Sequence, residues 1–93
     1  MQQLLGRWTG KIANLSIVLR FEKNDVGKFA VWMDSPDQKA MGIPVSSATL
    51  TKDKLLLKVA AVVGEYSATL NGNKMEGTWT QGGKPMPLVL TKE

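Results

Sequence analysis

Few residues in this chain could do chemistry, because its 93 residues include neither histidine nor cysteine. Ser-His-Asp and Cys-His catalytic arrangements are therefore excluded, as are metal sites built on thiolates or imidazoles. Two acids, Asp34 and Asp37, lie close together, and a carboxylate pair can serve in acid–base catalysis or bind a hard cation. This pair lacks a third ligand, so a turn and a helix start explain it more simply. We expect no catalytic residue, no metal and no cofactor.

Serine is the remaining candidate nucleophile, and it could act only with a lysine as its base. No S-x-x-K motif occurs, so the following serines are interpreted as polar strand positions: Ser16, Ser46, Ser47 and Ser67. The pair Gly82-Gly83 follows a predicted strand but precedes no predicted helix, which favours a turn over a phosphate-binding loop. The sequence therefore predicts a protein that is not an enzyme.

Strands must position any binding residues, because apolar and polar residues alternate along most of the chain. Ile17, Leu19 and Phe21, for example, share one face of such a segment. The alternation predicts eight strands, at residues 6–12, 16–22, 28–34, 45–50, 54–59, 65–70, 74–81 and 85–92. A chain of this length holds one hydrophobic core, so we expect a single domain over residues 1–93.

Turn residues predict how these strands pair. Asn71-Gly72 is typical of a type I′ hairpin turn and would set Ala68 opposite Met75. A turn at Gly82-Gly83 would set Trp79 opposite Met86. In both hairpins the apolar partners fall on the same face, so turn position and side-chain alternation agree.

An earlier hairpin meets the same test. A loop centred on Asp25 would pair Leu19 with Val31 on the inward face and Val18 with Trp32 on the outward face. The hairpins share one inward face, so the sequence predicts an all-β fold. We expect an eight-stranded antiparallel meander that closes into a small lipocalin-like barrel.

One connection, at residues 34–44, differs from the others. Ser35 could cap a helix, Pro36 suits its first position, and Gln38 stands three residues after the cap. Gly42 fits the helix end. We expect one short helix of about one and a half turns between strands three and four, at one barrel mouth.

Two groups of residues are candidates for binding. Inward-facing aromatic residues could line a cavity for a small apolar ligand, or could simply fill the interior: Trp8, Phe21, Tyr66 and Trp79. Outward-facing residues and the 34–42 loop could contact a partner domain or a second copy of the chain: Val18, Trp32, Asp34, Asp37 and Gln38.

Charge says little about partners. The net charge of +4 comes from basic residues spread from Arg7 to Lys92 without a dense patch, so nucleic-acid binding is not favoured. A less favoured alternative is a nucleic-acid-binding barrel that uses Lys52, Lys54 and Lys58, with Trp32 for base stacking.

The sequence leaves the compartment open. The longest apolar run, at residues 59–64, is too short to span a membrane. Residues 1–5 do not form a signal peptide, so the chain would be cytoplasmic as written, or exported if a leader had been removed.

Several motifs, taken in order, resemble a known family. Gly6-x-Trp8 alone resembles the signature that opens the barrel of lipocalins. The full succession of motifs comprises Gly6-x-Trp8-x-Gly10, Asp34-Ser35-Pro36-Asp37-Gln38, Gly42-Ile43-Pro44-Val45, Glu76-Gly77-Thr78-Trp79-x-Gln81-Gly82 and Pro87-Leu88-x-Leu90. This succession resembles the small all-β module that precedes the α/β-hydrolase domain in many bacterial exported serine hydrolases, notably of the Bacteroidetes. Lys39 departs from the family pattern, which usually has a small residue there. The resemblance implies a module without catalytic residues, whose catalytic groups would lie in a following domain.

These observations predict a non-catalytic, lipocalin-like β-barrel module that binds a partner domain or a small apolar ligand. The resemblance implies that it is accessory to a serine hydrolase domain. The alternative is a stand-alone homodimeric interaction protein whose core is filled.

Overall fold

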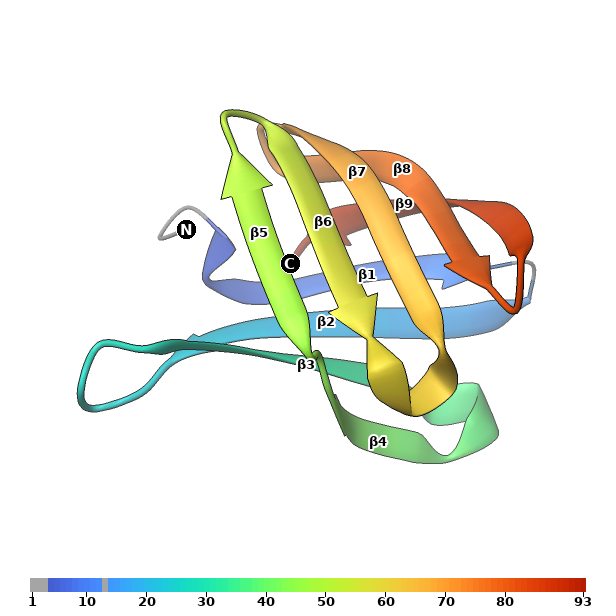
Figure 1. The fold of residues 1–93 in the computed structure, drawn as a ribbon, viewed down its shortest axis with the longest axis horizontal. Helices are drawn as coiled ribbons and strands as arrows, with labels where there is room; N and C mark the ends of the chain where they lie inside the picture. The colour runs from blue at the N-terminus through green and yellow to red at the C-terminus, as the bar shows by residue number, and fades with distance from the viewer. Residues whose placement is uncertain (1–3, 13) are drawn as a thin grey trace.

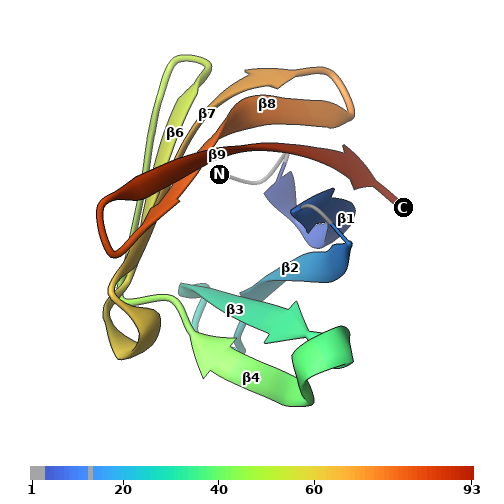
Figure 2. The same ribbon diagram turned by 90° about the vertical axis from the view of Figure 1, so that its right-hand side faces the viewer.

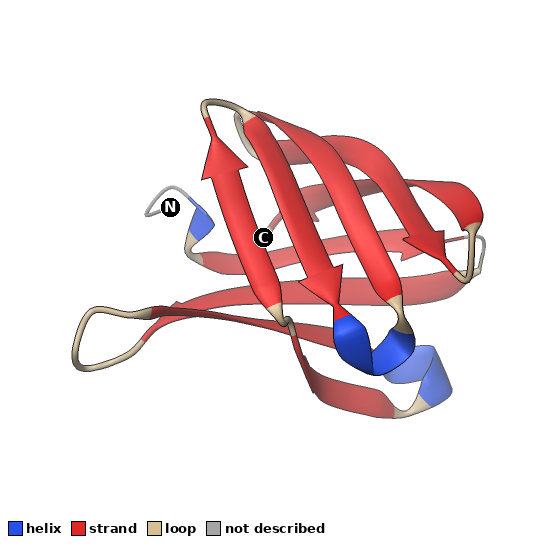
Figure 3. Ribbon diagram, viewed as in Figure 1, coloured by secondary structure: helices blue, strands red, loops and turns tan. Residues whose placement is uncertain are grey.

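One antiparallel sheet contains most of the chain. The computed structural model describes residues 4–12 and 14–93 (Figure 1). The strands, in chain order, are β1 (Gly6–Ile12), β2 (Leu15–Lys23), β3 (Phe29–Ser35), β4 (Ala40–Pro44), β5 (Ser47–Thr51), β6 (Lys54–Val59), β7 (Gly64–Asn71), β8 (Lys74–Gln81) and β9 (Lys84–Lys92). Two three-residue 3₁₀ turns, η2 (Pro36–Gln38) and η3 (Ala60–Val62), interrupt them. They lie at the same end of the sheet (Figure 3).

The sheet folds back on itself to form two facing layers. Its strand order is β4-β3-β2-β1-β9-β8-β7-β6-β5. Figure 2 shows β1 to β4 on one side of the core and β6 to β9 on the other. The two layers are joined where Trp8 to Gly10 of β1 pair with Leu90 to Lys92 of β9. The predicted all-β antiparallel meander is confirmed.

The predicted closure of the barrel is only partly realised, because β4 and β5 end the sheet without pairing to each other in the described chain. The chain crosses between these two edges at residues 45 and 46. The Val45 N–H donates to the Val31 carbonyl on one side, 3.0 Å away, and the Ser46 N–H donates to the Lys58 carbonyl on the other, 2.7 Å away. The result is a curled half-barrel with an open seam.

The number of strands and the helix differ from expectation at residues 35–44. The helix is a single 3₁₀ turn that ends at Lys39, whose φ of 55° is left-handed. Gly42 does not end a helix: it lies within β4, where its N–H donates to Asp34 Oδ1 over 2.7 Å. Residues 40–44 therefore become a ninth strand along the edge of β3, since an extended segment gains ladder hydrogen bonds there.

Two of the predicted hairpin registers are wrong by two residues. Ala68 lies opposite Gly77, and Met75 lies opposite Leu70. The turn is Gly72-Asn73, with Gly72 at a φ of 62°. A type I′ turn at Asn71-Gly72 would have needed a positive φ at Asn71 as well, whereas this arrangement needs it only at glycine.

The β2–β3 hairpin is shifted in the same way. Leu19 lies opposite Met33 and not Val31, and Trp32 lies opposite Arg20 and not Val18. A shift of two residues leaves each side chain on its predicted face, so the inward set survives. The β8–β9 hairpin has the predicted register, with Trp79 opposite Met86.

The core fills the space between the two layers. Its buried polar atoms have partners: the Trp8 indole N–H donates to the Leu4 carbonyl over 2.9 Å, and the Tyr66 hydroxyl donates to the Leu88 carbonyl over 2.7 Å. The remaining core side chains are apolar: Ile12, Ile17, Leu19, Phe21, Val31, Met33, Leu55, Leu57, Val59, Ala68, Met75, Trp79 and Leu90. Phe29 shares the alternating face of Val31 and Met33 but is 39% exposed, at the first position of β3.

Neighbouring residues of β8 test these faces. Trp79 is 4% exposed in the core, whereas Thr78 is exposed on the outer face. Trp79→Ala should lower the free energy of unfolding by about 3–5 kcal/mol because it leaves a cavity. Thr78→Ala should lower it by less than about 1 kcal/mol. Denaturant unfolding measures both, and equal losses would contradict the assigned faces.

Candidate functional site

The four inward-facing aromatic residues lie deep in the core. Trp8, Phe21, Tyr66 and Trp79 are exposed by 0, 3, 1 and 4% respectively. The space among the central side chains, which include Tyr66 and Trp79, is a cavity of only about 10 Å³. A volume this small is at the limit for one water molecule, so a ligand there would have to displace side chains. Ligand binding by these four residues stays a prediction.

A larger cavity opens at the barrel mouth, where η2 and η3 lie. Its volume is about 140 Å³, and Trp79 is the one member of the aromatic group that lines it. Most of the lining is apolar, with Ser35, Gln38 and Gln81 as polar members: Ile12, Leu15, Ile17, Met33, Ser35, Gln38, Ala40, Ile43, Val62, Trp79, Gln81 and Met86. No motif in the sequence indicates this site, because six strands and both of these 3₁₀ turns contribute residues to it.

Local packing holds the Trp79 ring at this mouth. Gly64 lies directly against the ring, and a Cβ there would collide with the ring atoms Cζ2 and Cη2. The indole N–H donates to Gln81 Oε1 over 3.2 Å. Met33 and Met86 also line the cavity, and unbranched thioether side chains adapt readily to the shape of a guest. The cavity lining therefore combines the fixed Trp79 ring with two adaptable side chains, Met33 and Met86.

The residues predicted to contact a partner do not form one exposed patch. Val18 faces outward on β2 as predicted but is only 7% exposed, and Asp34 is 3% exposed. Trp32 is half-buried beside Arg20 and Pro44 on the neighbouring strands. The accessible part of this group is therefore Trp32 with the exposed η2 residues described next.

A hydrogen bond connects the η2 turn to β2. Asp37 is exposed, and its Oδ2 accepts a hydrogen bond of 2.7 Å from the Ser16 N–H. Gln38 is also exposed, and its Oε1 accepts a hydrogen bond of 2.8 Å from the Ser35 hydroxyl. Since Gln38 also lines the mouth cavity, the predicted contact loop and the cavity form one continuous surface.

Asp34 is the centre of a buried ionic cluster that sequence reasoning missed. The Arg20 guanidinium binds both carboxylate oxygens, with Nε 2.8 Å from Oδ2 and Nη2 3.2 Å from Oδ1. Burial alone would raise the pKa of Asp34, but the hydrogen bonds from the Gly42 N–H and from Arg20 outweigh it and hold the pKa below its usual value. The same pairing raises the pKa of Arg20. The predicted register hid this pair, since it set Arg20 opposite Ala30.

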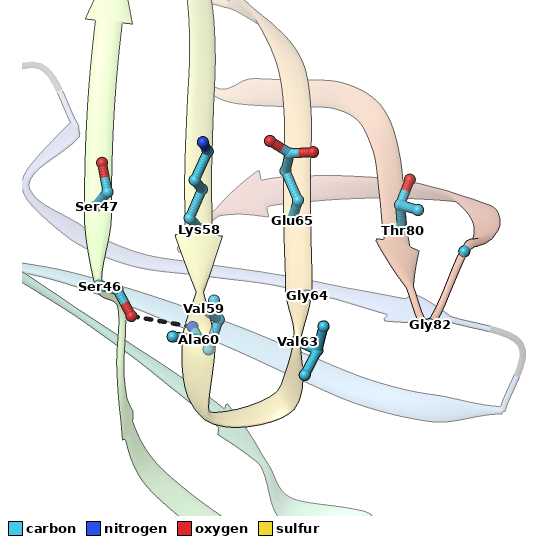
Figure 4. A pocket seen from close by; sticks show the side chains of 11 residues that line it. Ser46, Ser47, Lys58, Val59, Ala60, Val63, Gly64, Glu65, Thr80 and Gly82 are labelled. Carbon is cyan, nitrogen blue, oxygen red and sulfur yellow. Dashed lines mark hydrogen bonds between the residues drawn. The ribbon is translucent and has the colours of Figure 1, made fainter.

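An open groove of about 500 Å³ crosses the outer face of β5 to β8 (Figure 4). Ser47 lies opposite Lys58 on the next strand, and Lys58 lies opposite Glu65. All three side chains are exposed, and Figure 4 shows them side by side with Thr80. Ser47 and Lys58 are thus a directly opposed serine–lysine pair, as Ser16 and Lys11 also are, but Ser47 and Lys58 are exposed and no burial activates either group.

The groups needed for the alternative functions are dispersed. Lys54 and Lys58 lie on β6, with the Lys54 ammonium 3.0 Å from the Thr69 hydroxyl, whereas Trp32 lies on β3 in the other layer. No cluster of three or more acids that could hold a metal ion occurs in residues 4–12 and 14–93. Within the same residues, no helix has the length and apolar character needed to cross a membrane.

Comparisons with known proteins add no relative: no family model, no curated protein and no solved structure matches the chain. The resemblance to the module that precedes α/β-hydrolase domains is therefore carried by its motifs alone and stays a prediction.

Replacing the buried acid tests the ionic cluster. Asp34→Asn should lower the free energy of unfolding at pH 7 by about 1–3 kcal/mol, since charged hydrogen bonds are lost. The folded pKa of Asp34 lies below its unfolded value of about 3.9, so its contribution is present above that pH and is lost as the pH falls through the folded pKa. The difference between variant and wild type should shrink accordingly in acid.

Glu22→Gln is the matched control for this measurement. Glu22 also contacts Arg20, at 3.4 Å, but its side chain is 53% exposed. Its replacement should change stability by less than about 0.5 kcal/mol. A difference between Asp34→Asn and wild type that stays constant down to pH 2 would contradict the lowered pKa.

Proposed function

We propose that this chain is a non-catalytic β-barrel module that binds one apolar side chain of a partner domain at the barrel mouth. The observation that carries the proposal is the mouth cavity of about 140 Å³. Its rim includes Leu15, Ile43, Val62 and Met86, which are all only half-buried. When a guest covers half-exposed apolar side chains around a cavity, the removal of their apolar surface from water favours binding.

The size of the cavity defines the guest. An apolar protein cavity of about 150 Å³ accommodates benzene, whereas pockets for drug-sized molecules measure about 300–1,000 Å³. A single leucine or phenylalanine side chain matches the mouth, and a larger lipocalin-type ligand exceeds it. Gln38 and Gln81 stand beside the apolar lining, where their amides can bind the polar backbone that carries such a side chain.

A partner domain supplies such a side chain most directly. The resemblance to hydrolase-associated modules points to a serine hydrolase domain as that partner. The η2 turn supports this choice, because Asp37 and Gln38 offer exposed polar groups next to the cavity. An apolar anchor in a pocket with a polar rim is the usual anatomy of a protein–protein contact.

A small probe tests the mouth directly. N-acetyl-leucinamide, titrated into protein with labelled methionine methyl groups, should shift the signals of Met33 and Met86. The signals of Met41, which is exposed outside the cavity, and Met75, which is buried away from it, should stay unchanged. Burial of one such side chain stabilises by about 2–3 kcal/mol, so half-saturation is expected at about 10–30 mM and saturation only at several times that concentration. N-acetyl-serinamide should shift neither signal.

Two variants of η3 separate the cavity from nonspecific binding. Val62 lines the cavity, whereas Ala61 on the same turn is exposed outside it. Val62→Phe should fill the mouth and abolish the methyl shifts, and Ala61→Phe should leave them unchanged. Shifts that persist in Val62→Phe, or an absence of shifts in the wild type, would overturn the proposal.

Absence of catalysis is a separate expectation. The exposed Ser47 and Lys58 have no neighbour that would activate them, so a nitrophenyl acetate should react only slowly with surface lysines. Product formation should neither saturate nor recur after the protein is acylated. Repeated turnover that Ser47→Ala or Ser46→Ala abolishes would contradict this expectation and show that the protein is an enzyme.

A further inference from the structure

The two edges of the sheet are protected very differently. The β4 edge contains Gly42 at a φ of 67°, a register shift opposite Met33 to Ser35, and Pro44, which has no N–H. Irregularity and proline are the devices that keep sheet edges from pairing. Residues 47–51 of β5 contain no proline, glycine or charge, and they keep a regular register with β6. The β5 edge is therefore open to another strand.

Nothing in the described chain pairs with the outer side of β5. It is the last strand in the sheet order, and Figure 1 shows it at the front without a neighbour beyond it. The seam beside it continues into a groove of about 360 Å³, whose lining residues are all uncharged and include Trp32 and Pro44. Backbone donors and acceptors along this side of β5 can form a ladder with an added strand.

The sequence of β5 is complementary to itself. If two copies pair antiparallel about Thr49, Ser47 lies opposite Thr51 and Ala48 lies opposite Leu50. The exposed hydroxyl side chains then meet on the outer face, and the half-buried Ala48 and Leu50 cover each other on the inner face. Cross-strand pairs of both kinds stabilise a sheet.

The charged residues lie outside this ladder. The strand ends at Ser47 on one side, because Ser46 lies in a bend, and at Thr51 on the other, where Lys52 and Asp53 form the β5–β6 turn. The partner's β5–β6 turn would then extend toward the uncharged groove at the seam. A two-fold axis through Thr49 pairs all five residues of β5 at once, as a symmetric interface requires.

We propose that two copies of this chain associate through their β5 strands, antiparallel and centred on Thr49, into one continuous sheet. The interface uses none of the residues that line the mouth cavity, so it is independent of the proposed function. The occupant of the open edge is thus a second copy and not a segment of another protein.

Single-cysteine variants test the register, because the chain has no cysteine of its own. Residues directly opposite in an antiparallel pair have Cβ atoms about 4.5–5.5 Å apart, close to disulfide geometry. Thr49→Cys should therefore form a covalent dimer under mild oxidation. Thr78→Cys is the control, since Thr78 is also exposed on the outer face but lies on β8, which has a neighbouring strand on each side. We expect Thr49→Cys to cross-link at least about tenfold faster.

Light scattering on cysteine-free protein tests the dimer itself. The wild type should show twice the chain mass of 10.1 kDa at high concentration. Thr49→Lys, which sets two ammonium groups opposite each other, should weaken the dimer by about tenfold or more. Thr78→Lys should have no effect, and circular dichroism checks that both variants are folded.

Three outcomes would overturn the proposal. One is a wild type that stays monomeric up to about 1 mM, since the dissociation constant of the dimer would then be too high for a specific contact. Another is equal cross-linking of Thr49→Cys and Thr78→Cys. The third is a dimer that persists in Thr49→Lys but dissociates in Val62→Phe, because the contact between the two copies would then lie at the mouth. A failed dimer leaves the methionine titration of the mouth unaffected, so the two proposals fail separately.

Discussion

The short contact between the first and last strands controls the rest of this structure. A chain of this size has one sheet with which to cover both sides of a core, so the sheet must turn back on itself. It does so where β1 and β9 pair over three residues, from Trp8 to Gly10. Gly10 permits the contact, because a Cβ there would collide with the Val89 carbonyl oxygen. The neighbouring β1–β2 ladder has seven such pairs, so the junction is much shorter than the ladder beside it.

Both proposed binding surfaces depend on this geometry. Between the layers, Trp8 and Tyr66 are almost completely buried and help to fill the centre. Toward η2 and η3 the filling side chains leave the apolar mouth cavity. On the opposite side from the junction, β4 and β5 remain as edges, with an open seam between them. One constraint on the sheet thus accounts for a filled centre, an open mouth and an unpaired edge strand.

Sequence patterns predicted some of these features better than others. The faces of the strands were predictable, because alternation decides whether Trp79 points in or out whatever the register. The register was predictable where two glycines define the turn, at Gly82-Gly83, and not where one glycine can take either turn position, as at Gly72. The ninth strand was missed because it depends on a hydrogen bond from Gly42 to Asp34, which lies eight residues away on β3. The mouth cavity lay beyond prediction, since it is the space left between elements.

The central proposal is that the mostly apolar mouth cavity takes one small apolar guest, and a crystal structure under xenon pressure tests it most directly. Xenon enters apolar protein cavities of about 150 Å³ and scatters strongly enough to be located without ambiguity. We predict one xenon atom at the mouth, in contact with Met33, Met86 and the Trp79 ring. Ordered water molecules that stay in that space under xenon pressure, or a mouth closed by Val62 without xenon, would contradict the proposal.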